Sequence, residues 1–292
     1  MADKLFPTTV IGSLPRPEWI REVILDRKEG RISEEDVDSL LDGAIESAVR
    51  LQERAGLDEI TDGEWRRESY VKIFAERVRG FQHDLNPSDG VLSYPAVVAP
   101  IEYYRPLAAE EVRYTRKLTQ RRVKATLPAP YIVGRRMWHP EHSKAAYPSP
   151  EKLMADCVPI LRQEIEAIRD IGADTIQLDE PWLSTMVDPR FRERENVTDL
   201  QYEMDLCVDL INQTVDGIEG IATGMHICHA HFDHKHATKG GYELIMPALQ
   251  NVRVDTISME YATPDAGGLE SLSQFPENRR LGLGCIDHCD TH

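Results

Sequence analysis

Short apolar runs alternate along the chain with longer stretches in which apolar residues recur at helical spacing. The runs with the length and composition of β-strands are Thr8–Ile11, Glu59–Asp62, Val123–Leu127, Thr175–Leu178, Gly224–Ile227, Val254–Met259 and Leu281–Ile286. Strands that alternate with helices predict a parallel sheet built from βαβ units. Seven strands in this order, without a glycine-rich dinucleotide loop, favour an α/β fold of the (β/α)8 TIM-barrel type over a doubly wound sheet.

The helical stretches between these runs begin at capping residues. Ser33 precedes a stretch whose apolar residues follow the helical period, and Ser149 stands before Pro150, which suits a first helical turn. The helix that begins at Ser149-Pro150 is expected to end near Gly172, and a further helix is expected from about Asp199 to Val215. Each of these helices lies between two predicted strands, as βαβ units require.

Two parts of the chain depart from this alternation. Residues 82–122 combine an extended segment with a helical one, and we interpret them as an insertion, containing a hairpin, in one barrel domain that spans residues 1–292. The chain also ends soon after the seventh strand, whereas a closed barrel of this type needs eight. Either an element is misread or the eighth strand is missing from this sequence, and we favour the second explanation.

Composition narrows the class of protein. The 292 residues include 34 Lys and Arg against 50 Asp and Glu, a formal charge of −16, which argues against nucleic acid or an anionic membrane as a partner. No apolar run reaches the roughly 20 residues of a membrane span, and no leader sequence is recognisable. Five widely spaced cysteines in a chain of this size indicate reduced thiols, so we expect a cytoplasmic protein.

Polar residues cluster where the predicted strands end, which is the face that carries the active site in barrels of this type. The residues concerned are Ser13, Asp62, Glu64, Trp65, Asp179, Glu180, His226, Cys228, Glu260, Asp287, His288 and Cys289. Plainer interpretations exist for single members of the set. Asp179-Glu180-Pro181 is also typical of a helix N-cap, and Glu64 among charged neighbours is also typical of a surface ion pair.

The pair His226 and Cys228 carries the most chemical information. Residues two apart in a strand project from the same face, so one imidazole and one thiol can reach a single ion, and Glu260 can complete the set. Imidazole, thiolate and carboxylate together favour zinc. The alternative is a buried histidine beside an inert core cysteine. We expect the later histidines His231, His234 and His236 to lie in an exposed loop.

Several motifs together resemble the catalytic domain of the cobalamin-independent methionine synthase family, from about Phe6 to His292. They are Pro7–Pro17 (PTTVIGSLPRP), Asp62-Gly63-Glu64, Lys124–Pro130 (KATLPAP), Gln177–Pro181 (QLDEP), His226-Ile227-Cys228, Ile257–Glu260 and Gly282–Asp287. The resemblance implies a barrel, bound zinc and methyl transfer to a thiol. Only one barrel's length is present, which resembles the short branch of the family.

Carried over by position, the resemblance assigns roles to particular residues. It implies that His226, Cys228 and Glu260 are zinc ligands, while Ile11, Gly12, Ser13, Glu64 and Asp179 bind the amino-acid substrate. The family's fourth ligand is a cysteine on an eighth strand, which has no counterpart here, and Cys289 is the candidate substitute for it. The stretch between Cys228 and Glu260 is also longer than in the family and includes Gly240-Gly241.

The leading hypothesis is zinc-dependent methyl transfer to homocysteine, giving methionine, with methyltetrahydrofolate polyglutamate or a methyl-corrinoid as the donor. Asp287 or His288 is the candidate proton relay to the leaving group. A related enzyme that opens an epoxide with a sulfonated thiol is the nearest alternative, and its basic clamp would be Arg16, Arg66 and Arg135-Arg136. A non-catalytic zinc-binding homologue is a second alternative. The sequence does not determine the oligomeric state.

Overall fold

The computed structural model describes residues 5–83, 85, 94–232 and 235–287. The helices are α1 Glu18–Lys28, α2 Glu34–Arg54, α3 Lys72–Arg77, α4 Ala109–Leu118, α5 Pro130–Met137, α6 Pro150–Ile171, α7 Pro181–Thr185, α8 Pro189–Arg194, α9 Leu200–Val215 and α10 Met246–Leu249, with 3-10 turns at Tyr242–Leu244, Pro264–Ala266 and Leu269–Gln274. The strands are β1 Glu59–Ile60, β2 Val78–Gln82, β3 Ala96–Tyr103, β4 Arg122–Pro128, β5 Thr175–Asp179, β6 Ala222–Ile227, β7 His231–Phe232, β8 Lys235–His236, β9 Thr256–Glu260 and β10 Arg280–Gly284.

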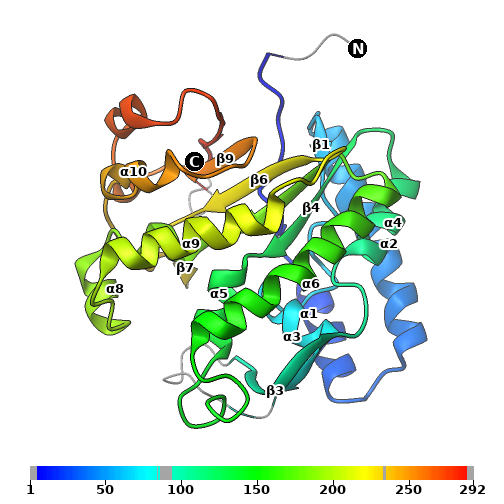
Figure 1. Ribbon diagram of the computed structural model, residues 1–292. Helices are drawn as coiled ribbons and strands as arrows, with labels where there is room; N and C mark the ends of the chain where they lie inside the picture. Colours follow the sequence, from blue (N-terminus) through cyan, green and yellow to red (C-terminus); the bar gives the residue numbers. More distant parts are fainter. Residues whose placement is uncertain (1–4, 84, 86–93, 233–234, 288–292) are drawn as a thin grey trace.

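Six strands form one parallel sheet in the order β1-β4-β5-β6-β9-β10. Each of these strands overlaps a run that the sequence predicts, and the α/β barrel-type fold is confirmed as a curled parallel sheet, a half-barrel, with helices on its outer side. Figure 1 shows α6 and α9 lying side by side across that outer side. Among the described residues, no helix combines the length and the apolar composition that a membrane crossing requires.

The prediction of a strand at Thr8–Ile11 is wrong, because this segment makes only a single parallel bridge, between Thr9 and Glu59. Here side chains, rather than the backbone amides of a neighbouring strand, donate hydrogen bonds to three consecutive carbonyls. The carbonyls of Val10, Ile11 and Gly12 accept hydrogen bonds from Lys124 Nζ, Gln177 Nε2 (3.0 Å) and Thr61 Oγ1 (2.9 Å), respectively. The segment is therefore fastened beside the sheet without joining it as a strand.

The predicted helix starts are confirmed. Ser33 accepts a hydrogen bond from the amide of Asp36 at the start of α2, and Asp199 accepts one from Tyr202 at the start of α9. Ser149 occupies the N-cap of α6 without a side-chain cap bond, and α6 ends at Gly172, whose φ of 98° is the left-handed conformation that glycine adopts at low cost.

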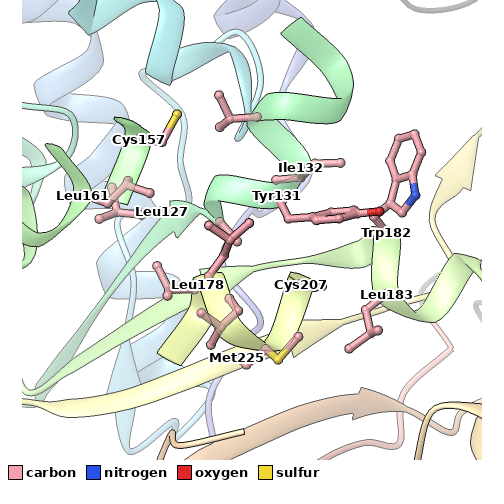
Figure 2. Packing of buried hydrophobic residues seen from close by; sticks show 14 of the residues in the cluster. Leu127, Tyr131, Ile132, Cys157, Leu161, Leu178, Trp182, Leu183, Cys207 and Met225 are labelled. Carbon is pink, nitrogen blue, oxygen red and sulfur yellow. The ribbon is translucent and has the colours of Figure 1, made fainter. Parts of the chain in front are cut away.

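The main core lies between the sheet and its helices. Leu127, Leu178 and Met225 are register partners on β4, β5 and β6, and Figure 2 shows them beside Leu161 of α6 and Cys207 of α9. Each of these side chains is 0% exposed, and burying one such aliphatic side chain contributes about 1.5–3 kcal/mol. Because side chains alternate along a strand, this outward row sends the intervening residues to the inner, concave side of the sheet.

An antiparallel hairpin, β2 with β3, occupies the region where the sequence predicts an insertion, although β2 begins earlier, at Val78. The hairpin lies apart from the main sheet, at the foot of Figure 1. The fully buried Glu164 of α6 ties it and the following helix down. Its carboxylate accepts hydrogen bonds from the amides of Ala108 and Ala109 (2.7 Å each), at the start of α4, and from the Tyr103 hydroxyl (2.9 Å).

Candidate active site

The carboxyl ends of β5, β6 and β9 bring the predicted polar residues together on the concave side. Asp179 is the register partner of His226, and His226 is in turn the partner of Ser258. Ile227 and Met259 are the last register partners of β6 and β9, and Cys228 and Glu260 are the residues that follow them in the chain. Along their strands, these residues alternate with the buried residues that point outward, such as Leu178 and Met225. Their side chains therefore face the inside of the curled sheet.

Asp179 holds the imidazole of His226. Its Oδ1 lies 3.0 Å from His226 Nδ1 and accepts a second hydrogen bond from Gln177 Nε2 at 2.8 Å. Burial alone lowers the pKa of His226, but the neighbouring Cys228 and the Asp179 carboxylate outweigh that effect and raise the pKa to about 10. Asp179, predicted as a substrate ligand, therefore acts in this structure as the carboxylate partner of a histidine, an arrangement common around metal-bound histidines.

Cys228 lies half-buried at the end of β6. Its side chain is close enough to His226 to raise the pKa of that imidazole, and its backbone carbonyl accepts a hydrogen bond from Ser184 Oγ at 2.6 Å. The segment after β6 is thus held by α7, the helix that follows the neighbouring strand. A thiol and an imidazole in contact, with a carboxylate behind the imidazole, form a donor set that suits a zinc ion.

Glu260 ends β9 and is held by two residues of the preceding segment. Its Oε1 lies 2.5 Å from His236 Nε2, and its amide donates to the Tyr242 hydroxyl at 3.2 Å. The expectation that His236 lies in an exposed loop is wrong, because its side chain is only 7% exposed in the short β7–β8 hairpin. His231 pairs with His236 in that hairpin, and His234 lies outside the described residues.

A second group gathers around Glu64, which lies in the loop after β1 with a φ of 57°. Its Oε2 accepts a hydrogen bond from Ser13 Oγ, and its Oε1 accepts one from Thr126 Oγ1 at 2.6 Å. Burial raises the pKa of Glu64, but the Arg67 guanidinium and these hydroxyls outweigh it and hold the pKa below its usual value. The surface ion-pair interpretation is therefore wrong, since Glu64 is 2% exposed.

The partners of Arg67 were not identified from the sequence. Arg67 is 1% exposed and donates through Nε and Nη2 to Glu111 Oε2 of α4 at 2.9 and 2.6 Å, and through Nη1 to the Thr126 carbonyl of β4 at 3.0 Å. Glu111 is separated from Arg67 by 44 positions, and no periodic pattern marks the pairing. This ion pair fixes the loop that carries Glu64 against the sheet.

Glu180 follows Asp179 and is fully buried. Its Oε2 accepts a hydrogen bond from the Ile132 amide at 3.0 Å, so it caps the start of α5. Burial raises the pKa of Glu180 to about 8, and the carboxyl group is therefore mostly protonated at neutral pH. The N-cap interpretation of the Asp-Glu-Pro motif holds in a modified form, because the helix that Glu180 caps with its side chain is α5 rather than the one it precedes.

The remaining candidates lie near the end of the chain. Asp287 is half-buried, three residues beyond β10, while His288 and Cys289 lie outside the described residues. Leu283 of β10 is 48% exposed, as on the rim of the sheet. The proton-relay roles of Asp287 and His288 thus stay predictions.

One further group of possible metal ligands has no counterpart in the sequence analysis. His139, Glu141 and His142, in the loop between α5 and α6, offer ligand atoms that all lie within 4.8 Å of one another. Because α6 runs back along the sheet, its N-terminal loop lies on the side where the strands end. The histidines were overlooked because neither follows a predicted strand.

Comparison with known proteins extends these observations. A family model described as "Cobalamin-independent synthase, Catalytic domain" matches residues 6–291. Two curated relatives named "Methionine synthase" are similar to almost the whole chain. The protein of Sulfolobus acidocaldarius is 30% identical over 98% of this chain and 77% of its own length, and that of Saccharolobus solfataricus is 31% identical over 97% and 77%.

Solved structures show the same fold. A B12-independent methionine synthase from Shewanella sp. W3-18-1, in complex with selenomethionine, superposes with a TM-score of 0.77 at 24% identity, covering 97% of this chain and 81% of that one. A putative vitamin-B12 independent methionine synthase from Listeria monocytogenes gives a TM-score of 0.71 at 21% identity, covering 95% and 80%.

Proposed function

Because the chain belongs to the cobalamin-independent methionine synthase family, we propose that it is a zinc-dependent methyltransferase that methylates the thiol of homocysteine. Membership of the family supports methyl transfer to homocysteine, whereas the zinc ion is argued from the residues of this chain and the methyl donor is a proposal drawn from the family resemblance alone. The observation that carries the proposal is the gathering of Asp179, His226, Cys228 and Glu260 on the concave side at the ends of three adjacent strands.

The residues that would hold the zinc ion are His226, Cys228 and Glu260. The contact between His226 and Cys228 and the carboxylate of Asp179 on His226 Nδ1 fit such a centre, because that carboxylate fixes the ring and leaves Nε2 as the ligand atom. Bound zinc would supply thiol deprotonation at neutral pH, where a free thiol with a pKa near 8.5 is only partly ionised.

The amino-acid portion of the substrate would bind in the Glu64 group. Glu64 stays anionic at neutral pH because its pKa is lowered, so it suits the ammonium group of an amino acid. Ser13 lies against Glu64, and the neighbouring Ile11-Gly12 backbone is fastened to the sheet, so this segment suits the substrate carboxylate. Asp179 adds negative charge on the ammonium side.

The donor would be methyltetrahydrofolate polyglutamate or a methyl-corrinoid, and Asp287 or His288 would return a proton to the leaving group. A sulfonated thiol, the substrate of the alternative enzyme, would need free cationic side chains. Arg66 instead forms ion pairs with Asp38 and Asp42, and Arg135 pairs with Glu203. Arg16 donates to the Glu64 carbonyl, and Arg136 lies over the Trp182 ring. The ion pairs of Arg66 and Arg135 therefore weigh against a clamp formed by all four arginines.

The test combines metal analysis with turnover. Wild-type protein, Cys228→Ser and the exposed-site control Cys285→Ser are assayed for zinc per chain and for methionine formed from homocysteine with each donor in turn. We expect zinc and turnover in the wild type and the control, and loss of turnover together with loss of one zinc per chain in Cys228→Ser. Wild type without zinc, or Cys228→Ser with undiminished turnover, would overturn the proposal. A non-catalytic homologue would bind zinc and form no methionine with either donor.

A further inference from the structure

We propose that His236 is a positioning residue that holds the Glu260 carboxylate in place as a metal ligand. The proposal rests on the proposed function, in which Glu260 binds the metal. His236 belongs to the stretch between Cys228 and Glu260, which also carries the β7–β8 hairpin. Its Nε2 lies 2.5 Å from Glu260 Oε1, so the imidazole and the carboxylate are in direct hydrogen-bond contact.

The contacts of the ring indicate which of its two nitrogens donates to Glu260. A carboxylate only accepts hydrogen bonds, so Nε2 of His236 carries the proton that it shares with Glu260. The other nitrogen, Nδ1, lies 3.4 Å from the Thr263 hydroxyl and 3.9 Å from Asp265 Oδ2. The ring is thus held from both ends, and its side chain is 7% exposed, which limits competition from water.

The backbone around His236 is fixed by its own hairpin. His236 pairs with His231 in the antiparallel ladder, and the next amide, of Ala237, donates to the Ala230 carbonyl at 2.8 Å. Thr238 binds the His229 carbonyl through both its amide (3.2 Å) and its hydroxyl (2.9 Å). These hydrogen bonds fix the backbone next to His236 and thereby the position of its imidazole.

The hairpin is also attached to the body of the protein. The Lys239 amide donates to Asp188 Oδ2 at 3.1 Å, and Lys239 Nζ pairs with Asp265 at 2.9 Å. On the inner side, the buried ring of His229 lies 4.9 Å from the ring of Tyr242, whose hydroxyl accepts from the Glu260 amide. The backbone of Glu260 is therefore held by Tyr242, and its side chain is held by His236.

The consequence is a carboxylate with one oxygen occupied. With Oε1 engaged by His236, Glu260 would bind the metal through Oε2 in a single orientation. Outer partners of metal ligands typically change metal affinity by 10- to 100-fold. His236 would therefore strengthen metal binding without being a ligand.

The experiment measures zinc affinity by chelator competition in wild type, His236→Ala, His236→Gln and the exposed control His83→Ala. We expect a loss of about 10- to 100-fold for His236→Ala, recovery of most of it in His236→Gln, which retains an N–H donor, and no change for His83→Ala. Visible absorption of the cobalt-substituted proteins should keep the same ligand-field bands, since the ligands are unchanged. Thermal unfolding of the metal-free variants reports whether the fold is intact.

The outcomes separate the two proposals. Zinc binding in wild type with a change below about twofold in His236→Ala would overturn the positioning role and leave the proposed function standing. Equal losses in His236→Ala and His236→Gln, together with lower unfolding temperatures of the metal-free proteins, would also overturn it, because the role would be structural. Absence of zinc from the wild type would overturn the proposed function and this proposal with it.

An independent observation supports a second inference, on the loop between α5 and α6. The geometry points to a separate divalent transition-metal site formed by His139, Glu141 and His142, whose ligand atoms lie within 4.8 Å of one another. The two imidazole rings stack at 4.8 Å with an interplanar angle of 24°. Two imidazoles and one carboxylate favour zinc, copper or nickel over calcium or magnesium.

Hydrogen bonds within the loop fix its shape. The buried Ser143 accepts a hydrogen bond from the His139 amide at 2.9 Å and donates its own amide to the His139 carbonyl at 2.8 Å. Calorimetric titration of the Cys228→Ser protein with zinc should show one site that is absent when His142→Ala is added. Magnesium should give no binding. A titration without a site, or one that His142→Ala leaves unchanged, would overturn this inference.

Discussion

Asp179 Oδ1 lies 3.0 Å from His226 Nδ1, and this contact links the acid at the end of β5 to the imidazole at the end of β6. The two residues are register partners in adjacent parallel strands, so the backbone ladder itself sets their separation. Gln177, two residues earlier on β5, bonds to the same oxygen and restricts its rotation. The orientation of His226 therefore depends on side chains that would not bind the metal themselves.

Asp179→Asn should weaken zinc binding by about 10- to 100-fold, because a neutral amide neither raises the basicity of the imidazole nor specifies its tautomer as the carboxylate does. Chelator competition measures the effect. The control is Asp170→Asn, at the exposed end of α6, which should bind zinc as the wild type does. Unchanged affinity in Asp179→Asn would show that the contact has no part in holding the metal.

Gly12→Ala should damage the amino-acid pocket. A Cβ atom at position 12 would stand 2.5 Å from Glu64 Oε1, so Glu64 or the segment must move. Overpacking of this kind costs about 1–3 kcal/mol, and we expect the KM for homocysteine to rise about tenfold. Gly43→Ala, in α2 with nothing near its Cβ, should instead stabilise the protein by about 0.5–1 kcal/mol. Steady-state kinetics and urea unfolding distinguish the two, and an unchanged KM in Gly12→Ala would contradict the argument.

Arg67→Met should lower the free energy of unfolding by about 3–5 kcal/mol, because it leaves Glu111 buried without its cation. Arg66→Met removes an ion pair to the exposed Asp42 and should cost about 1 kcal/mol or less. Urea denaturation of the two metal-free variants gives both values. Similar losses in both variants would mean that burial does not distinguish the two pairs.

Glu180→Gln should change how stability depends on pH. The pKa of Glu180 is about 8 when folded and near 4.5 in the unfolded chain, so the folded state binds more protons between these values. Stability from this group is therefore present below about pH 4.5 and declines as the pH rises toward 8. Glu180→Gln removes that decline, so the variant should gain about 2–4 kcal/mol over wild type between about pH 5 and pH 8. Urea unfolding of both proteins at about pH 5 and pH 8 measures this gain. The same stability difference between variant and wild type at both pH values would contradict the prediction.

Most of the sheet could be predicted because a buried parallel strand is a short continuous apolar run, and β4, β5, β6 and β9 are such runs. The start of the chain could not be, because the carbonyls of residues 10–12 bond to side chains of distant residues. A short apolar run predicts burial. It does not show whether the backbone pairs with a neighbouring strand or accepts hydrogen bonds from side chains.

The amino-acid sequence by itself determined which residues end the strands, and hence that His226, Cys228, Glu260 and Asp179 share one end and one face of the sheet. Strand periodicity is a local property, and the alternation of strands with helices implies a parallel sheet, which is why this part could be predicted. The tertiary structure decided which polar groups touch. It placed Asp179 on His226, His236 on Glu260 and Arg67 on Glu111. Such pairings depend on long-range packing and on the burial that strengthens them, neither of which leaves a periodic pattern in the chain.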